Sequence, residues 1–129
     1  MSSICLDSSG WIEIAHDGAN AKAFAKALSS SAPLIVSAIS LYEIARYTTR
    51  VAGEAAAGEL LAFLHQHAVT PVSPEIATLA ATLGARHQLA MADSLIYATA
   101  LAHNATLWTQ DGDFKGLPHV KYFPKIKPS

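Results

Sequence analysis

The sequence predicts a three-layer α/β/α domain, in which helices cover both faces of a central, mainly parallel sheet of four to five strands. Short apolar runs alternate with longer alanine-rich segments that have helical spacing, which is typical of a parallel sheet. A length of 129 residues is enough for one hydrophobic core and too short for two ordinary domains. We therefore expect one domain over residues 1–124, followed by a short disordered tail at 125–129.

The strands are predicted from four short apolar runs and a fifth, weaker one. They cover residues 3–6, 34–37, 69–72, 106–109 and 120–123. The clearest helix start is Ser73-Pro74-Glu75, which supplies an N-cap, a proline suited to the first turn and an acid near the positive helix end. The predicted helices cover 19–28, 39–50, 54–66, 74–87 and 91–103, and a short one carries Trp11 and Ile12.

The overall charge and the single cysteine exclude several classes of protein. A formal net charge of −1 argues against a broad basic surface, so any contact with nucleic acid must be local. Cys5 stands alone in an apolar run, which excludes an internal disulfide and a cysteine-based zinc site. We find no signal peptide and no apolar run near the ~18 residues of a membrane span, so we expect a cytoplasmic protein without membrane contacts.

Two aspartates stand at the ends of predicted strands. Asp7 closes the first apolar run, and Asp111 comes just after the fourth. The carboxyl ends of parallel strands meet at one edge of a sheet, where open α/β sheets bind their ligands. Each residue also has a structural interpretation, because Asp7 can cap the short helix after it and the Asp111-Gly112 pair is a common turn.

Two further acids are expected near the same edge. Glu43 follows the second strand by only six residues, although it also has the spacing of a capping box with Ser40. Asp93 interrupts a helix that is otherwise apolar or small on every face, where an ionised carboxylate is costly unless it is paired or binds a metal. Capping of the helix start is the alternative for Asp93.

Carboxylates that converge on one edge would repel one another or take up protons, and a divalent cation removes that conflict. Oxygen ligands alone favour Mg²⁺ or Mn²⁺ over zinc, and no two of the six histidines have the i, i+4 spacing of a helical zinc site. One or two such ions suit the hydrolysis of phosphodiesters. The sequence therefore predicts a metal-dependent enzyme that hydrolyses phosphodiesters.

Four motifs, in this order and spread over nearly the whole chain, carry a family resemblance. They are Leu6-Asp7-Ser8-Ser9, Ser40-Leu41-Tyr42-Glu43, Ala92-Asp93-Ser94-Leu95-Ile96 and Thr109-Gln110-Asp111-Gly112-Asp113-Phe114. Together they resemble the PIN-domain nucleases, and among these most of all VapC, the toxin of VapBC toxin–antitoxin modules.

The resemblance implies a site and a set of roles. The implied acidic quartet is Asp7, Glu43, Asp93 and Asp111, with Asp113 as a possible supplementary ligand. We expect the three aspartates of the quartet to bind the metal and Glu43 to position or deprotonate the attacking water. Ser9 and Thr109 match the family's small hydroxyl positions near the metal, so we expect them to hydrogen-bond to its ligands unless they are ordinary turn residues.

The resemblance also implies partners. VapC-like toxins are typically homodimers, are inhibited by a cognate VapB antitoxin, and cut structured RNA such as transfer RNA or ribosomal RNA. For phosphate contacts we expect Arg46, Arg50 and Lys115, whose alternative is a solvated surface charge. An apolar groove for an antitoxin helix or the dimer partner could use Trp11, Ile12, Tyr42 and Tyr47, which otherwise fill the core.

Two other functions stay open at this point. One is a catalytically silent PIN-like domain that only binds RNA or protein, with its acids serving as caps. The other is a phosphoacceptor signalling domain, which also has acids at strand ends. Such a domain would need a lysine after its penultimate strand, where this chain has Thr109-Gln110.

Overall fold

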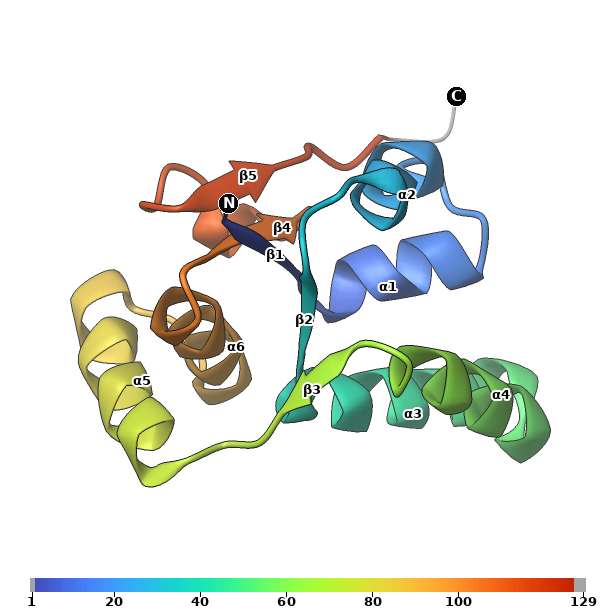
Figure 1. Ribbon diagram of the computed structural model, residues 1–129, viewed down its shortest axis with the longest axis horizontal. Coiled ribbons are helices and arrows are strands. Elements are labelled where there is room, and N and C mark those ends of the chain that lie inside the picture. Colours follow the sequence, from blue (N-terminus) through green and yellow to red (C-terminus); the bar gives the residue numbers. More distant parts are fainter. Residues whose placement is uncertain (1, 127–129) are drawn as a thin grey trace.

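The computed structural model describes residues 2–126 and confirms the predicted α/β fold. Its centre is a sheet of five strands in the order β3-β2-β1-β4-β5, and every neighbouring pair is parallel (Figure 1). The strands are β1 (Ser3–Leu6), β2 (Leu34–Ser37), β3 (Ala68–Thr70), β4 (Ala105–Thr109) and β5 (Val120–Tyr122). Of the predicted tail at 125–129, residues 127–129 lie outside the described residues.

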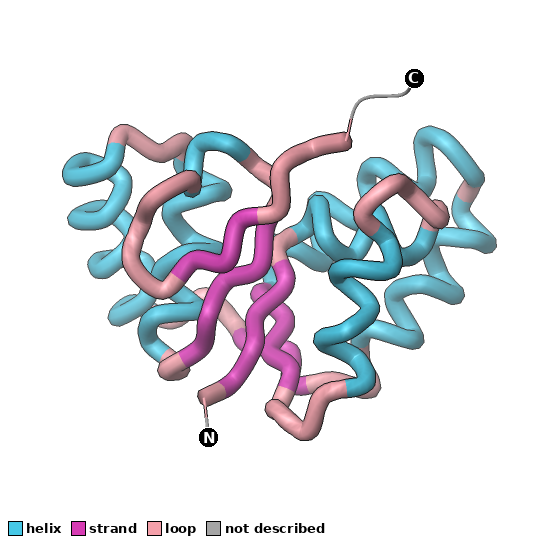
Figure 2. The backbone as a smooth tube through the Cα atoms, turned by 90° about the horizontal axis from the view of Figure 1, so that it is seen from above, coloured by secondary structure: helices cyan, strands magenta, loops and turns pink. Residues whose placement is uncertain are grey.

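Helices form a layer on each side of the sheet (Figures 1 and 2). On one side lie α1 (Ser8–Ala15), α2 (Ala21–Ser29), α3 (Ala38–Ala52) and α4 (Glu54–Leu64). On the other side lie α5 (Pro74–His87) and α6 (Met91–Ala102). Within the described residues, no helix is both long enough and apolar enough to cross a membrane.

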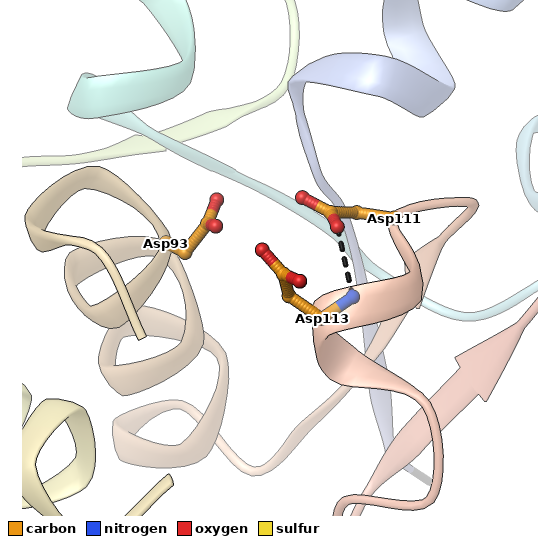
Figure 3. Close-up of side chains that lie close together, drawn as sticks. All are labelled: Asp93, Asp111 and Asp113. Atoms are coloured by element: carbon orange, nitrogen blue, oxygen red, sulfur yellow. Dashed lines mark hydrogen bonds between the residues drawn. The ribbon is translucent and has the colours of Figure 1, made fainter. Parts of the chain in front are cut away.

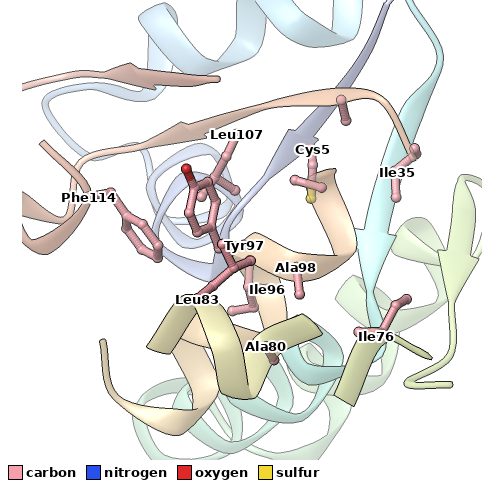
Figure 4. Close-up of a cluster of buried hydrophobic side chains, with 12 residues drawn as sticks. Cys5, Ile35, Ile76, Ala80, Leu83, Ile96, Tyr97, Ala98, Leu107 and Phe114 are labelled. Carbon is pink, nitrogen blue, oxygen red and sulfur yellow. The ribbon is translucent and has the colours of Figure 1, made fainter. Parts of the chain in front are cut away.

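The two faces of the sheet build two cores, and successive strand residues contribute to opposite ones. In β1, Cys5 packs towards α5 and α6, whereas Ile4 and Leu6 pack towards α1 to α4. Figure 4 shows the first core, where Ile96 and Tyr97 of α6 lie over the sheet. Burial on both faces explains why the strands appear in the sequence as continuous apolar runs, without alternation of polar residues.

The third predicted strand, at 69–72, is shifted and shortened to Ala68–Thr70. Thr70 pairs with Ser37, the last residue of β2, so the chain has no partner strand beyond this point. Pro71 follows directly and has no backbone N–H to donate.

The capping box expected from Ser40 and Glu43 is wrong. The N-cap of α3 is Ser37, the last residue of β2, and its hydroxyl accepts a hydrogen bond from the Ile39 backbone N–H at 3.1 Å. Ser40 is already inside the first turn and is fully buried. Because strand and helix join without a loop, α3 begins before the predicted position, and the Glu43 side chain is free for a tertiary contact.

Candidate metal centre

Three aspartates from two separate segments meet beyond the carboxyl end of β4. Asp93 lies in the first turn of α6, and Asp111 and Asp113 belong to the turn around the short 3₁₀ helix η1 (Gly112–Phe114). One carboxylate oxygen from each lies within 4.8 Å of the others, and Figure 3 shows the three side chains pointing towards one another. We call Asp93, Asp111 and Asp113 the aspartate cluster.

The turn that carries two of these aspartates is anchored in the core. Asp111 caps η1, because its Oδ1 accepts a hydrogen bond from the Asp113 backbone N–H at 2.9 Å. Phe114, at the end of η1, is fully buried and packs edge-on to Tyr97 of α6, with ring centroids 5.9 Å apart. The Tyr97 hydroxyl donates to the Pro118 carbonyl at 2.7 Å. The same helix that presents Asp93 therefore also holds the loop of Asp111 and Asp113.

Close packing between α5 and α6 fixes the first turn of α6. A Cβ atom at Gly84 would lie 2.5 Å from the Ser94 Oγ, so only glycine lets the two helices approach this closely. The Ser94 hydroxyl donates to the Ala90 carbonyl at 2.8 Å. These contacts fix the position of Asp93, which precedes Ser94 in the first turn of α6.

Asp7 lies beside the aspartate cluster and is only 5% exposed. Its Oδ1 accepts hydrogen bonds from the Ser9 hydroxyl at 2.6 Å and from the Gly10 backbone N–H at 3.0 Å, and its Oδ2 accepts one from the Thr109 hydroxyl. A carboxylate has about four lone-pair sites, so three bonds leave room for one further ligand. Asp7 thus caps α1 and remains able to bind a cation.

Glu43 approaches from α3, on the opposite side of the sheet from α6. The Ser8 hydroxyl donates to its Oε1 at 2.6 Å, which joins α1 to α3 across 35 positions of the chain. In the described structure Oε2 has no hydrogen-bond partner. The negative charge of Glu43 helps to raise the pKa of Asp93, so the two carboxylates lie close enough to interact.

Burial and crowding of the acids change the pKa values of Asp93 and Asp7. Burial and the neighbouring carboxylates together raise the pKa of the Asp93 carboxyl to about 7, and burial is the largest cause, followed by the charges of Asp111, Glu43, Asp7 and Asp113 in that order. Burial also raises the pKa of Asp7, and Asp111 adds to this, while the hydrogen bonds from Ser9, Thr109 and Gly10 oppose it. Among the described residues no lysine, arginine or histidine forms an ion pair with these acids.

The donor set fits a hard divalent cation. Every candidate ligand is a carboxylate oxygen, which is the chemistry that Mg²⁺ and Mn²⁺ prefer and zinc does not require. A carboxyl group that is half-buried among other acids is costly to ionise, and a bound cation would remove that cost. Asp93, Asp111 and Asp113 could hold such an ion, with Asp7 adjacent.

The structure places all the sequence-predicted acids in one region. Asp113, expected only as a supplementary ligand, belongs to the tight cluster, whereas Asp7 and Glu43 flank it. Sequence reasoning missed Ser8, which hydrogen-bonds to Glu43. The only signal was its place in Asp7-Ser8-Ser9, and the pattern alone does not show which hydroxyl points to which acid.

The predicted contact residues divide into exposed and buried ones. Arg46, Arg50 and Lys115 are exposed, and the two arginines lie on α3 one and two turns beyond Glu43. Trp11 is 1% exposed and belongs to the core, so it cannot line a groove. Tyr42, by contrast, is 60% exposed.

Comparisons with known proteins agree with this fold. The family model of the PIN domain matches residues 4–120. A solved toxin–antitoxin complex from Klebsiella pneumoniae is 25% identical with a TM-score of 0.79, over 96% of this chain and 100% of that one. No curated protein sequence matches the chain.

Two further solved structures share the fold. The toxin VapC20 from Mycobacterium tuberculosis, which cleaves the sarcin-ricin loop, is 22% identical with a TM-score of 0.75, over 98% of this chain and 100% of that one. VapBC2 from Rickettsia felis, bound to a DNA fragment from its promoter, is 17% identical with a TM-score of 0.74, over 93% and 98%. Because the family model matches residues 4–120, which make up most of the chain and nearly the whole sheet, the chain belongs to the PIN domain family.

Proposed function

We propose that this PIN domain is a cytoplasmic endoribonuclease that depends on Mg²⁺ or Mn²⁺ and acts as a VapC-type toxin of a type II toxin–antitoxin system. VapC proteins of this family are nucleases, and the proposal extends that activity to this chain with RNA of the transfer or ribosomal class as substrate. The observation that carries it is the aspartate cluster, which has no basic partner among residues 2–126 and has Asp7 and Glu43 nearby.

The roles follow from which carboxylate oxygens are already engaged. We assign one or two metal ions to Asp93, Asp111 and Asp113, together with the one free lone-pair site of Asp7. Ser9 and Thr109 then orient Asp7 by their hydrogen bonds. A divalent ion bound here would lower the pKa of a water molecule bound to it and would stabilise the negative charge that develops on the phosphoryl oxygens.

Glu43 is assigned to the proton transfer. Hydrolysis forms a bond from a water oxygen to phosphorus and breaks the bond from phosphorus to one ribose oxygen, which takes a proton from solvent and leaves as a hydroxyl. The Ser8 hydroxyl occupies Glu43 Oε1, and this fixes the carboxylate with Oε2 open. Oε2 is therefore the atom that positions the attacking water and accepts its proton.

The cleavage chemistry is tested by the dependence on metal. We expect the purified chain to cut transfer or ribosomal RNA with Mg²⁺ or Mn²⁺ present, and to lose all cleavage when EDTA is added. Gel analysis of end-labelled RNA, with the metal restored in excess of EDTA, checks this. Cleavage that resists EDTA would require a different chemistry, and RNA binding without cleavage in any metal would leave only a silent binding domain.

The toxin role makes a separate prediction. The Klebsiella pneumoniae structure is a complex of toxin and antitoxin, which supports a cognate VapB-type antitoxin as the partner of this chain. In this proposal the chain forms a homodimer, and the antitoxin binds that homodimer. We expect the protein encoded by the neighbouring reading frame to co-purify with this chain and to suppress its cleavage of RNA. If co-expression gave no stable complex, the toxin assignment would fall while the nuclease assignment stood.

A further inference from the structure

The exposed side of α3 beside Glu43 has an unusual set of side chains. An open hollow of about 590 Å³ is lined by Glu43 and by four residues that we call the α3 platform: Tyr42, Arg46, Tyr47 and Arg50. The platform therefore begins at one of the acids of the candidate metal centre and continues away from it along the helix.

Helical spacing puts these side chains in one stripe. Tyr42, Arg46 and Arg50 follow one another at i, i+4 and i+8, and Tyr47, at i+5, flanks this stripe. At 1.5 Å per residue, Tyr42 and Arg50 are roughly 12 Å apart along the axis. The stripe thus has an aromatic ring at one end and two guanidinium groups along the length of a few nucleotides.

The Tyr42 ring and the two arginines of the platform are available for a ligand, whereas the Tyr47 ring is covered by Arg50 and contacts His16. Arg46 donates to the Tyr42 hydroxyl at 2.8 Å, a contact at the edge of the ring that leaves its faces open, and Tyr42 is 60% exposed. The Arg50 guanidinium lies over the Tyr47 ring, 5.4 Å from its centroid. In the described part of the chain, neither arginine is paired with a carboxylate.

We propose that the α3 platform is the binding site for single-stranded RNA next to the cleaved bond, a proposal that rests on the nuclease function above. A base would stack on the exposed Tyr42 ring, and Arg46 and Arg50 would bind the phosphates next to it. Stacking on an aromatic ring requires an unpaired base, so the platform selects a loop or an end of a structured RNA.

The charges favour RNA over a protein helix as the occupant. An amphipathic helix that covered this face would bury two guanidinium groups and would have to supply an anion for each. An RNA strand carries one phosphate per nucleotide and a planar base beside it, so it can supply a base to Tyr42 and a phosphate to each arginine. The chain has a net charge of −1 and therefore no broad basic surface, but the two platform arginines give it a local site for phosphates.

Binding is best measured where the RNA cannot be cut, in the full chain carrying Asp93→Asn. The probes are a short fluorescein-labelled single-stranded RNA and its abasic counterpart, which has the same phosphates and no bases. We expect Tyr42→Ala to weaken binding of the RNA about tenfold and to leave the abasic strand unaffected. Tyr42→Phe keeps the ring and should bind the RNA as tightly as the parent.

Arg50→Ala provides the complementary result. It should weaken binding of both strands and lower the slope of log Kd against log salt by about 0.7, the value for one phosphate on a single strand. Arg86→Ala, on the exposed end of α5 in the opposite layer, is the matched control and should change neither quantity. In the cleaving protein, Tyr42→Ala should raise KM and leave kcat nearly unchanged.

Three outcomes would overturn the platform. They are unchanged RNA binding by Tyr42→Ala with the antitoxin complex intact, unchanged RNA binding with loss of that complex, which would assign this face to a protein partner, and an equal loss of binding on the abasic strand. Because binding is measured in the Asp93→Asn protein, it can succeed or fail independently of whether the unmodified chain cleaves RNA.

Discussion

Asp93→Asn is expected to lower the cleavage of RNA by at least about a hundredfold while the fold stays intact. The substitution keeps the shape of the side chain and removes the charge that faces Asp111, Asp113 and Glu43. Ser94, its neighbour, makes the contacts that hold the first turn of α6, so the helix does not depend on Asp93. Cleavage rates in Mg²⁺, alongside circular dichroism and thermal unfolding, measure both parts.

The control for this result is Asp17→Asn, an exposed aspartate in a turn with φ of 53°, a conformation that asparagine also adopts readily. That variant should cleave at the unmodified rate. A second expectation distinguishes a metal-binding role of Asp93 from a role in stabilising the fold. The metal-free Asp93→Asn protein should be more stable than the parent at pH 8, because one of several like charges is gone. Undiminished cleavage by Asp93→Asn would refute the metal centre.

The parallel sheet was predictable because its strands are buried on both faces. Continuous apolar runs marked β1 and β2 at the bounds that the structure has, and the strand-then-helix alternation indicated parallel pairing. The start of α3 was not predictable in the same way, because Ser37 and Ser40 are both good N-caps and only the strand pairing shows that Ser37 is used.

The candidate site was predictable to the extent that topology determines it. Asp7 and Asp111 follow strands that pair side by side in parallel, so their convergence is a property of the sheet. The closeness of Asp113 to Asp93 depends instead on the course of η1, and the bond from Ser8 to Glu43 depends on how α1 lies against α3. Such side-chain directions arise from packing between distant segments and leave no local pattern.

The stability of the metal-free protein should fall as the pH rises from about 4 to about 7. Asp93 has a pKa of about 7 in the folded chain against 3.8 as the ordinary value, so the folded state holds the proton more tightly. The stabilisation from this proton is complete below pH 4 and is lost as the pH passes through 7. After allowance for solvent screening, we expect a loss of roughly 1–2 kcal/mol, and the raised pKa of Asp7 acts in the same direction.

A divalent cation should reverse this loss only where the carboxylates are ionised. At pH 8, Mn²⁺ or Mg²⁺ at a hundred times its Kd should add about 2.7 kcal/mol to the free energy of unfolding. At pH 5, where Asp93 keeps its proton, the same concentration should add much less. Urea unfolding at both pH values, with and without the ion, measures the difference, and Asp93→Asn should flatten both dependences. Equal stabilisation at pH 5 and pH 8 would mean that the ion binds elsewhere. Only at a site made of acids that titrate in this range does the binding of the ion depend on the pH.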